Sequence, residues 1–272
     1  MTRKWSTACT DWGDRLKRGE SIIPPPIFQD EADKALQVFK ALRIVDAPGS
    51  PTFGEACAPW VFDLAASIFG AYDASTGRRL ITEWFVLIPK KNSKSTIAAG
   101  IMMTALILNW RLSGEFTILA PTIEVAGNSY NPARDMCAEH INEDLHDLLH
   151  TQNHVKTIAH RTTQATLKVV AADANTAAGK KSIGTLVDEI WLFGKQANAA
   201  NMLREAVGGL ASRPEGFVVY LTTQSDEPPS GVFKQKLEYA RKVRDGEIVD
   251  PRFVPVLFEH PDDMVKAGEH LL

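Results

Sequence analysis

The feature that most constrains the fold is an apolar run that ends in a lysine-rich loop. Residues 85–88 read Phe-Val-Leu-Ile, residues 89–96 are polar apart from one proline, and residues 97–110 contain neither charge nor proline. A strand, a polar loop with Lys-Ser and then a helix is the layout of a phosphate-binding loop. Unpaired backbone N–H groups at the helix start, together with the helix dipole, favour an anion there.

Within this loop, Lys94 is expected to reach the β- and γ-phosphates of a nucleotide, and the Ser95 hydroxyl to ligate Mg²⁺. The usual pattern has glycine at two positions where this sequence has Ile88 and Ser93. A left-handed backbone at Ser93 would cost about 1–2 kcal/mol relative to glycine. Taken alone, the loop is also compatible with a solvated basic turn. The candidate nucleotide contacts are Pro89, Lys90, Lys91, Asn92, Ser93, Lys94, Ser95 and Thr96.

Charge and composition limit the classes of partner. The chain has 272 residues and a formal net charge of −3, so any contact with nucleic acid must come from a local basic face. Three widely spaced cysteines without a C-x-x-C motif indicate a reducing compartment and argue against a zinc site. The polar N-terminus is no signal peptide, and the apolar segment 97–110 is too short to cross a bilayer. The basic clusters are Lys90/Lys91/Lys94, Lys180/Lys181 and Arg241/Lys242/Arg244.

Apolar runs alternate with helical patterns, which predicts an α/β fold with a mostly parallel sheet and helices on both faces. Two helices, over 30–44 and 55–69, are expected to form a flap ahead of the first core strand. Residues 1–27 show little periodicity, and residues 175–184 are expected to form a loop of small residues. Strands are expected at 83–88, 116–120, 165–171 (paired with 154–159), 185–189, 217–223 and 253–258, and the later helices at 97–110, 121–131, 132–150, 196–207 and 231–244.

A second signal is the acidic pair Asp188-Glu189, which ends an apolar run beginning at Thr185. Ligands bind at the carboxyl edge of the strands in open α/β sheets, so both carboxylates are expected there. In a nucleotide hydrolase, the first would hold Mg²⁺ and the second would take a proton from the attacking water. The alternative is an ordinary helix N-terminus, where acidic residues are also favoured.

A third signal is the polar pair Thr222-Thr223 at the end of the next apolar run, where a side chain could sense the γ-phosphate. Each of the three signals is weak alone. Together they occur in the expected order, each at the end of a strand, and this coincidence favours a nucleotide hydrolase.

These residues resemble a known family, the ATPase domain of the terminase large subunits of tailed phages, from about residue 53 to residue 258. The most specific part is 88–95, where Lys90 stands at the family's arginine and Ser93 at its glycine. Gly77-Arg78-Arg79, Ala120-Pro121-Thr122, 187–190 and Thr222-Thr223 are also similar. The resemblance implies a three-layer αβα P-loop NTPase, RecA-like and of the additional-strand, conserved-glutamate class, with an N-terminal helical extension.

The resemblance also implies roles for single residues. Glu189 would be the catalytic base, Asp188 would hold the metal through its water shell, and Lys90 would be an extra phosphate contact. Thr222 and Thr223 would couple hydrolysis to movement. An arginine finger is expected from a neighbouring subunit, with Arg134 as first candidate and Arg204 or Arg213 as rivals. The family's adenine-reading glutamine is missing from Pro59-Trp60-Val61, which leaves Trp60 as the candidate base contact.

By the same resemblance, ATP and Mg²⁺ are the cofactors, and the activity is ATP hydrolysis that drives double-stranded DNA into a procapsid. The implied partners are the small terminase subunit, the portal protein and further copies of the chain in a pentameric ring, with a monomer when isolated and no membrane. The implied location is the host cytoplasm. We expect residues 1–75 to be an extension and helical flap, 76–258 the ATPase core, and 259–272 the start of a linker to a nuclease domain. Asp262-Asp263 reads as a helix start rather than a metal pair.

Two alternatives remain open from the sequence. One is another P-loop ATPase acting on nucleic acid, such as a helicase-like enzyme, although no further nucleic-acid motif follows residue 223. The other is a non-hydrolysing nucleotide-binding or assembly module, which Ser93 and the missing adenine-reading glutamine would favour.

Overall fold

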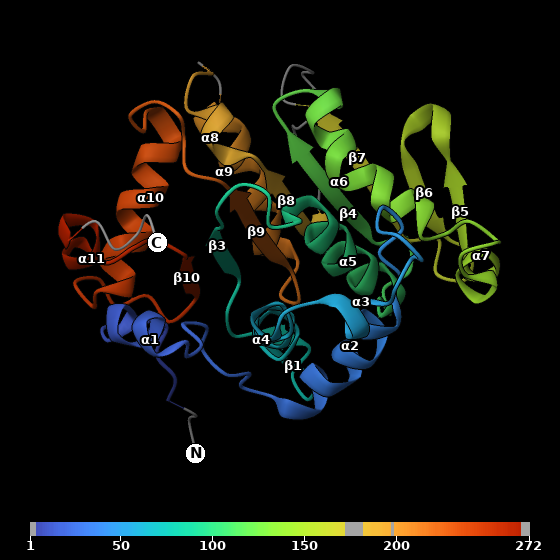
Figure 1. Ribbon diagram of the computed structural model, residues 1–272. Coiled ribbons are helices and arrows are strands. Elements are labelled where there is room, and N and C mark those ends of the chain that lie inside the picture. Colours follow the sequence, from blue (N-terminus) through green and yellow to red (C-terminus); the bar gives the residue numbers. More distant parts are fainter. Residues whose placement is uncertain (1–3, 172–181, 197–198, 268–272) are drawn as a thin grey trace.

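The computed structural model describes residues 4–171, 182–196 and 199–267 (Figure 1). These residues form one eight-stranded sheet in the order β10-β3-β9-β8-β4-β7-β6-β5 and a separate two-stranded ribbon. Neighbours from β10 to β7 are parallel, and β6 and β5 extend one edge antiparallel. The strands are β1 (Tyr72–Asp73), β2 (Arg78–Arg79), β3 (Glu83–Leu87), β4 (Glu115–Ala120), β5 (Leu149–Gln152), β6 (Thr157–His160), β7 (Thr166–Ala171), β8 (Ser182–Asp188), β9 (Phe217–Thr222) and β10 (Phe253–Leu257).

Helices cover both faces of the sheet, and the side chains of β3 show why. Trp84 and Val86 belong to a buried cluster shared with α4, α5 and α6, whereas Phe85 and Leu87 belong to a second cluster shared with α8, α9 and α10. Successive side chains of a strand point to opposite faces, so an uninterrupted apolar run supplies both cores. The predicted three-layer α/β architecture is confirmed. The helices are α1 (Trp12–Arg18), α2 (Gln29–Ala41), α3 (Phe53–Ala56), α4 (Pro59–Phe69), α5 (Lys94–Ile107), α6 (Ile123–Asp135), α7 (Glu143–Leu148), α8 (Ile190–Phe193), α9 (Ala199–Gly208), α10 (Gly231–Arg244) and α11 (Asp262–Ala267), with 3₁₀ turns η1 (Asn153–Val155) and η2 (Gly209–Ser212).

The strand order positions the three polar signals of the sequence. Strand β9 lies between β3 and β8, so the strand that precedes the lysine-rich loop is separated from the strand that ends in the acidic pair. This inserted strand is the additional strand that the class was expected to have. Because the three strands are parallel, their carboxyl ends meet at one edge.

The N-terminal helices pack on the main domain. Phe39 of α2 and Phe53 of α3 are buried in the same cluster as α5. A Cβ at Gly100 of α5 would lie 2.8 Å from the Phe39 ring and 2.9 Å from the Phe53 ring. Glycine at this point of an otherwise apolar helix therefore lets two aromatic rings approach its backbone. The domain boundary at residue 75 stays a prediction, since α2 and α3 share the core of α5.

Several predicted elements differ from the structure. Helix α6 runs through Pro132 to Asp135 instead of stopping before it, and residues 149–152 form strand β5 rather than the end of a helix. The helix expected over 55–69 is two helices, separated at Cys57 and Ala58. The chain near the N-terminus forms α1, which the sequence pattern did not predict. The loop expected at 175–184 lies mostly outside the described residues, and its last three residues belong to β8.

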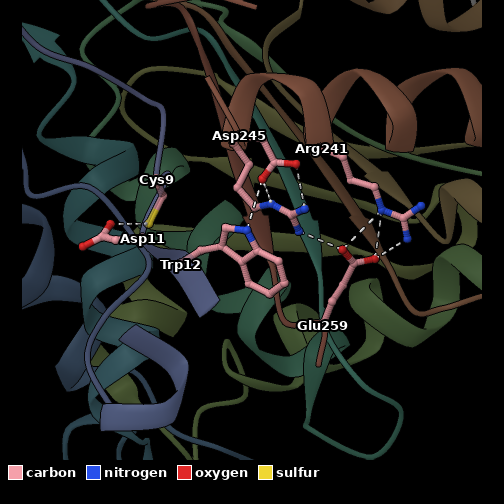
Figure 2. Close-up of polar contacts among 7 residues, drawn as sticks. Cys9, Asp11, Trp12, Arg241, Asp245 and Glu259 are labelled. Atoms are coloured by element: carbon pink, nitrogen blue, oxygen red, sulfur yellow. Dashed lines mark hydrogen bonds and ion pairs between the residues drawn. The ribbon is translucent and has the colours of Figure 1, made fainter. Parts of the chain in front are cut away.

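A cluster of ion pairs at the end of α10 contacts the N-terminal segment through Trp12 (Figure 2). Arg244 is buried and donates to Asp245 Oδ1 at 2.8 Å and Glu259 Oε2 at 2.9 Å. The Trp12 ring lies 3.9 Å from the Arg244 guanidinium, and its indole N–H donates to Asp245 at 3.1 Å. Arg241 pairs with the other side of Glu259. Trp12 therefore explains α1: a helix of two turns is stable here because tertiary contacts hold it.

The same cluster bears on the predicted basic faces. Arg241 and Arg244 are paired with acidic side chains, which weakens the case for a DNA contact at residues 241–244. The Lys180/Lys181 cluster lies outside the described residues.

We predict that Arg244→Met lowers the free energy of unfolding by about 2–3 kcal/mol, because it leaves the half-buried Glu259 with one partner fewer and removes the cation from Trp12. Urea denaturation measures the change. Arg18→Met, which breaks an exposed ion pair with Glu20, is the matched control and should leave stability unchanged. Equal stability of both variants would show that the cluster contributes nothing.

Candidate nucleotide-binding site

The lysine-rich loop leaves β3 and enters α5 in the predicted manner. The backbone N–H of Ile88 still pairs with the Thr222 carbonyl of β9 at 3.0 Å, and α5 begins at Lys94. Between them, Lys91 and Ser93 adopt positive φ angles of 71° and 50°. Ser93, with ψ of 29°, is left-handed, so the position that favours glycine in the usual pattern carries a side chain here.

This geometry gives a stability prediction. Ser93→Gly should raise the free energy of unfolding by about 1 kcal/mol, because glycine adopts the left-handed conformation without the Cβ penalty. Chemical denaturation measures it. Ser93→Ala keeps the Cβ and is the control, expected to match the wild type within about 0.5 kcal/mol. A loss of stability in Ser93→Gly would mean that the serine side chain contributes more than the strain costs.

Lys94 joins the loop to the acidic pair. Its ammonium lies 2.6 Å from Glu189 Oε1 and 3.7 Å from Asp188 Oδ1, and its side chain is largely buried. The lysine comes from the start of α5, whereas the two carboxylates come from the end of β8, with 95 positions between Lys94 and Glu189. The structure thus brings together the lysine of the first signal and the acidic pair of the second.

Asp188 is fully buried, and one of its two oxygens is well held. Ser129 of α6 donates to Oδ2 at 2.6 Å, while Oδ1 has no hydrogen-bond partner among the described residues. Burial raises the pKa of Asp188 above its usual value, and the nearby Lys94 opposes that rise. A buried carboxylate oxygen without a hydrogen-bond partner fits the donor set that Mg²⁺ takes in nucleotide sites, which is one or two carboxylates with waters and phosphates. No group of three or more His, Cys, Asp or Glu side chains that could hold a metal ion occurs in the described part of the chain.

A cavity of about 490 Å³ opens over these residues, a volume typical of small-molecule sites. Every candidate loop residue from Pro89 to Thr96 lines it, together with Glu189 and Thr223. Thr222 is fully buried one residue earlier, and its hydroxyl donates to the Thr223 carbonyl at 2.9 Å. The predicted polar end of β9 therefore faces the same cavity as the loop.

Three further candidate residues have other partners in the structure. Lys90 pairs with Asp226 at 2.5 Å, although both side chains are well exposed. Arg134 pairs with its neighbour Asp135 at 2.6 Å near the end of α6. Trp60 packs against Phe258, with ring centroids 5.1 Å apart, and is not among the residues described as lining the cavity.

Sequence reasoning missed several residues of the site. Ser129 and Trp191 hold the acidic pair, and Asp46, Asn128 and Pro132 line the cavity. Asp46 accepts from the Thr96 hydroxyl at 3.3 Å, which ties the loop after α2 to the start of α5. Of these residues, only Pro132 could be noticed in the sequence. A proline has no N–H to donate, so inside a helix it leaves the carbonyl four residues earlier without its helical partner.

The lysine-rich loop, the acidic pair and the strand between them define a P-loop nucleotide hydrolase of the additional-strand, conserved-glutamate class. The family model described as "Terminase large subunit, ATPase domain" matches residues 59–242, more than half of the chain. The chain belongs to this family, and it is an ATPase domain. No curated protein matches its sequence.

Solved structures of large terminases are similar to this chain. The HK97 bacteriophage large terminase has a TM-score of 0.67 at 18% identity, covering 85% of this chain and 44% of its own length. The ATPase domain of the Thermus phage P74-26 large terminase has a TM-score of 0.49 at 13% identity, covering 70% of this chain and 79% of its own length. A large terminase from a thermophilic bacteriophage, in complex with ADP, has a TM-score of 0.46 at 12% identity, covering 88% of this chain and 50% of its own length. This chain spans less than half the length of the HK97 protein.

Proposed function

We propose that this domain hydrolyses ATP with Mg²⁺ to drive double-stranded DNA into a procapsid, as the motor part of a terminase large subunit. The observation that carries the proposal is the position of Lys94, whose ammonium lies between the carboxylates of Asp188 and Glu189 and lines the cavity over the loop. In this arrangement a polyphosphate can replace the carboxylates as the partner of the lysine.

The residues have distinct roles in this proposal. Backbone N–H groups of the loop and Lys94 bind the phosphates, and Ser95 with Asp188 would hold Mg²⁺, Asp188 through water. When bound, Mg²⁺ would neutralise the negative charge that builds up on the transferred phosphoryl group. Glu189 takes a proton from the attacking water once Lys94 has turned to phosphate. Thr222 and Thr223, between the loop and the acidic pair, respond to the loss of the γ-phosphate.

Three further residues, Lys90, Trp60 and Arg134, take the roles that the resemblance implied. Lys90 exchanges its exposed partner Asp226 for phosphate, which an exposed pair permits at little cost. Trp60, near the loop edge of the sheet, contacts the adenine. Arg134 acts as an arginine finger on a neighbouring subunit.

The partners proposed are the small terminase subunit, the portal of the procapsid and further copies of the chain in a pentameric ring, with an isolated domain that is mostly monomeric. The setting is the cytoplasm of a bacterial host. None of the described helices is long and apolar enough to span a membrane. We further propose that residues 259–272 begin a linker to a nuclease domain and assign no nuclease chemistry to the described residues.

The proposal is tested by ATP hydrolysis of the purified chain with Mg²⁺ and with excess EDTA, beside binding of a fluorescent ATP analogue. Turnover that requires Mg²⁺ is the expected result. Neither binding nor turnover at any protein concentration would overturn the proposal and favour an assembly module, because the strained Ser93 would then have disabled the loop.

If a neighbouring subunit supplies the arginine finger, the ATPase activity should depend on protein concentration. Specific activity should rise by about tenfold or more with protein concentration, because a trans finger contributes strongly to phosphoryl transfer. Arg134→Ala should abolish the rise. Mixing Arg134→Ala with Glu189→Gln should restore activity, since one variant keeps the catalytic base and the other the finger. Activity that stays constant on dilution would argue for a finger in cis. If Arg204→Ala or Arg213→Ala, rather than Arg134→Ala, abolished the rise and regained it on mixing with Glu189→Gln, that rival would be the finger.

A further inference from the structure

Two neutral hydrogen-bond donors hold the acidic pair, and neither belongs to the phosphate-binding loop. Ser129 Oγ donates to Asp188 Oδ2 at 2.6 Å, and Trp191 Nε1 donates to Glu189 Oε2 at 2.9 Å. In each carboxylate, the second oxygen faces Lys94. The two acidic residues therefore share one pattern: one oxygen is anchored by a neutral donor, and the other is turned to the cation of the loop.

The anchors are supported by the fold. Ser129 is fully buried on α6, which packs against α5 and the sheet. Trp191 is on α8, lines the cavity and packs against the buried cluster beneath α8, α9 and α10. Glu189 has a left-handed backbone, with φ of 54°, which turns the chain sharply between β8 and α8. This turn brings the Trp191 indole back to the carboxylate of the residue two positions before it.

In the proposed function, on which this inference rests, Glu189 is the catalytic base and Asp188 holds the metal. Both carboxylates must then be oriented correctly. We infer that Trp191 and Ser129 are positioning residues for Glu189 and Asp188. When a phosphate becomes the partner of Lys94, Glu189 Oε1 and Asp188 Oδ1 lose their cation, while the two neutral anchors stay in place. The freed oxygens then point to where water and the metal shell must be, without a search over side-chain rotamers.

The two anchors should have different kinetic effects. Trp191→Phe keeps the aromatic packing and removes the N–H, so kcat for ATP should fall about tenfold with KM within about twofold, since a misaimed base affects the chemical step. Trp110→Phe, which replaces an exposed tryptophan outside the cavity, is the matched control and should change neither constant. Equal losses in both variants, or no loss in Trp191→Phe, would overturn the role of Trp191.

Ser129→Ala removes the donor to the metal carboxylate. The Mg²⁺ concentration for half-maximal activity should rise about tenfold, as for other residues that orient metal ligands. Ser67→Ala is the control, because Ser67 is also a buried hydrogen-bonded serine but accepts from Trp84 away from the site. A Ser129→Ala variant that loses activity without any change in its Mg²⁺ dependence would overturn the role of Ser129.

A spectroscopic measurement tests the Trp191 anchor without any turnover. The six tryptophans give separate indole N–H signals in a ¹H–¹⁵N spectrum, and the signal lost in Trp191→Phe identifies Trp191. Glu189→Ala should shift this indole proton upfield in nucleotide-free protein, because its carboxylate acceptor is gone, and leave the Trp110 signal in place. An unshifted signal would overturn the anchor. If Glu189→Ala shows the shift but the wild type has no ATPase activity, the proposed function fails and the anchor stands.

Discussion

Glu189→Gln is expected to abolish ATP turnover while leaving ATP binding intact. The amide cannot accept the proton of the attacking water, and loss of a general base costs about 10²–10⁴ in rate. Glutamine is nearly isosteric, and its carbonyl can still accept from the Trp191 indole. Binding should survive because Lys94, which lies 2.6 Å from Glu189 Oε1 in the structure, is freed from a charged competitor. Single-turnover hydrolysis and titration with a fluorescent ATP analogue measure the two effects.

The matched control for this substitution is Glu238→Gln, which changes an exposed carboxylate on α10 that pairs with Lys234 at 3.8 Å. It removes the same charge from a residue that does not line the cavity, so turnover should be unchanged. Wild-type rates in Glu189→Gln would show that another group takes the proton, and the assignment of the base would then be wrong.

Lys94→Ala has the second large effect, and it acts on two properties. It removes the phosphate contact, so turnover should fall about 10²–10³-fold and ATP binding should weaken. It also removes the cation beside the fully buried Asp188, whose pKa burial already raises. A buried carboxylate without its cation costs about 3 kcal/mol or protonates instead, so the nucleotide-free variant should be less stable than the wild type.

Thermal denaturation beside the ATPase assay separates these two effects. Lys34→Ala, which breaks an exposed ion pair with Glu31 on α2, controls for the loss of a lysine and should change neither activity nor stability. If Lys94→Ala kept full turnover, the serine-bearing loop would not be a phosphate site. If it lost turnover with unchanged stability, the ion pair with the acidic residues would contribute nothing in the absence of nucleotide.

The strands that were predictable from the sequence are those buried on both sides. Strands β3 and β9 are continuous apolar runs, and their predicted bounds agree with the structure to within a residue. Helix α10 agrees at both ends, since Gly231 follows two prolines and a serine, and the helical spacing continues to Arg244. In these elements the local pattern and the tertiary burial favour the same conformation.

The elements that were missed depend on contacts with other elements rather than on the pattern of their own residues. Helix α6 continues through Pro132, because its packing against α5 and the sheet compensates for one lost helical bond. Strand β5 exists as the antiparallel partner of β6 at the sheet edge. Helix α1 depends on the contact between Trp12 and Asp245, which lies 233 positions later.

The sequence by itself determined the class of fold and the chemistry at the end of each strand. Lys94-Ser95, Asp188-Glu189 and Thr222-Thr223 are contiguous signals, and parallel strands necessarily bring such ends to one edge. Only the tertiary structure decided which oxygen of each carboxylate faces Lys94, and that Ser129 and Trp191 hold the other. Single serine and tryptophan residues carry no periodic or spacing signal, and their hydrogen bonds depend on how α6 and the turn at Glu189 are packed. Local patterns were enough to infer that the strand ends meet at one edge of the sheet. The orientation of the side chains there depends on how the folded core is packed.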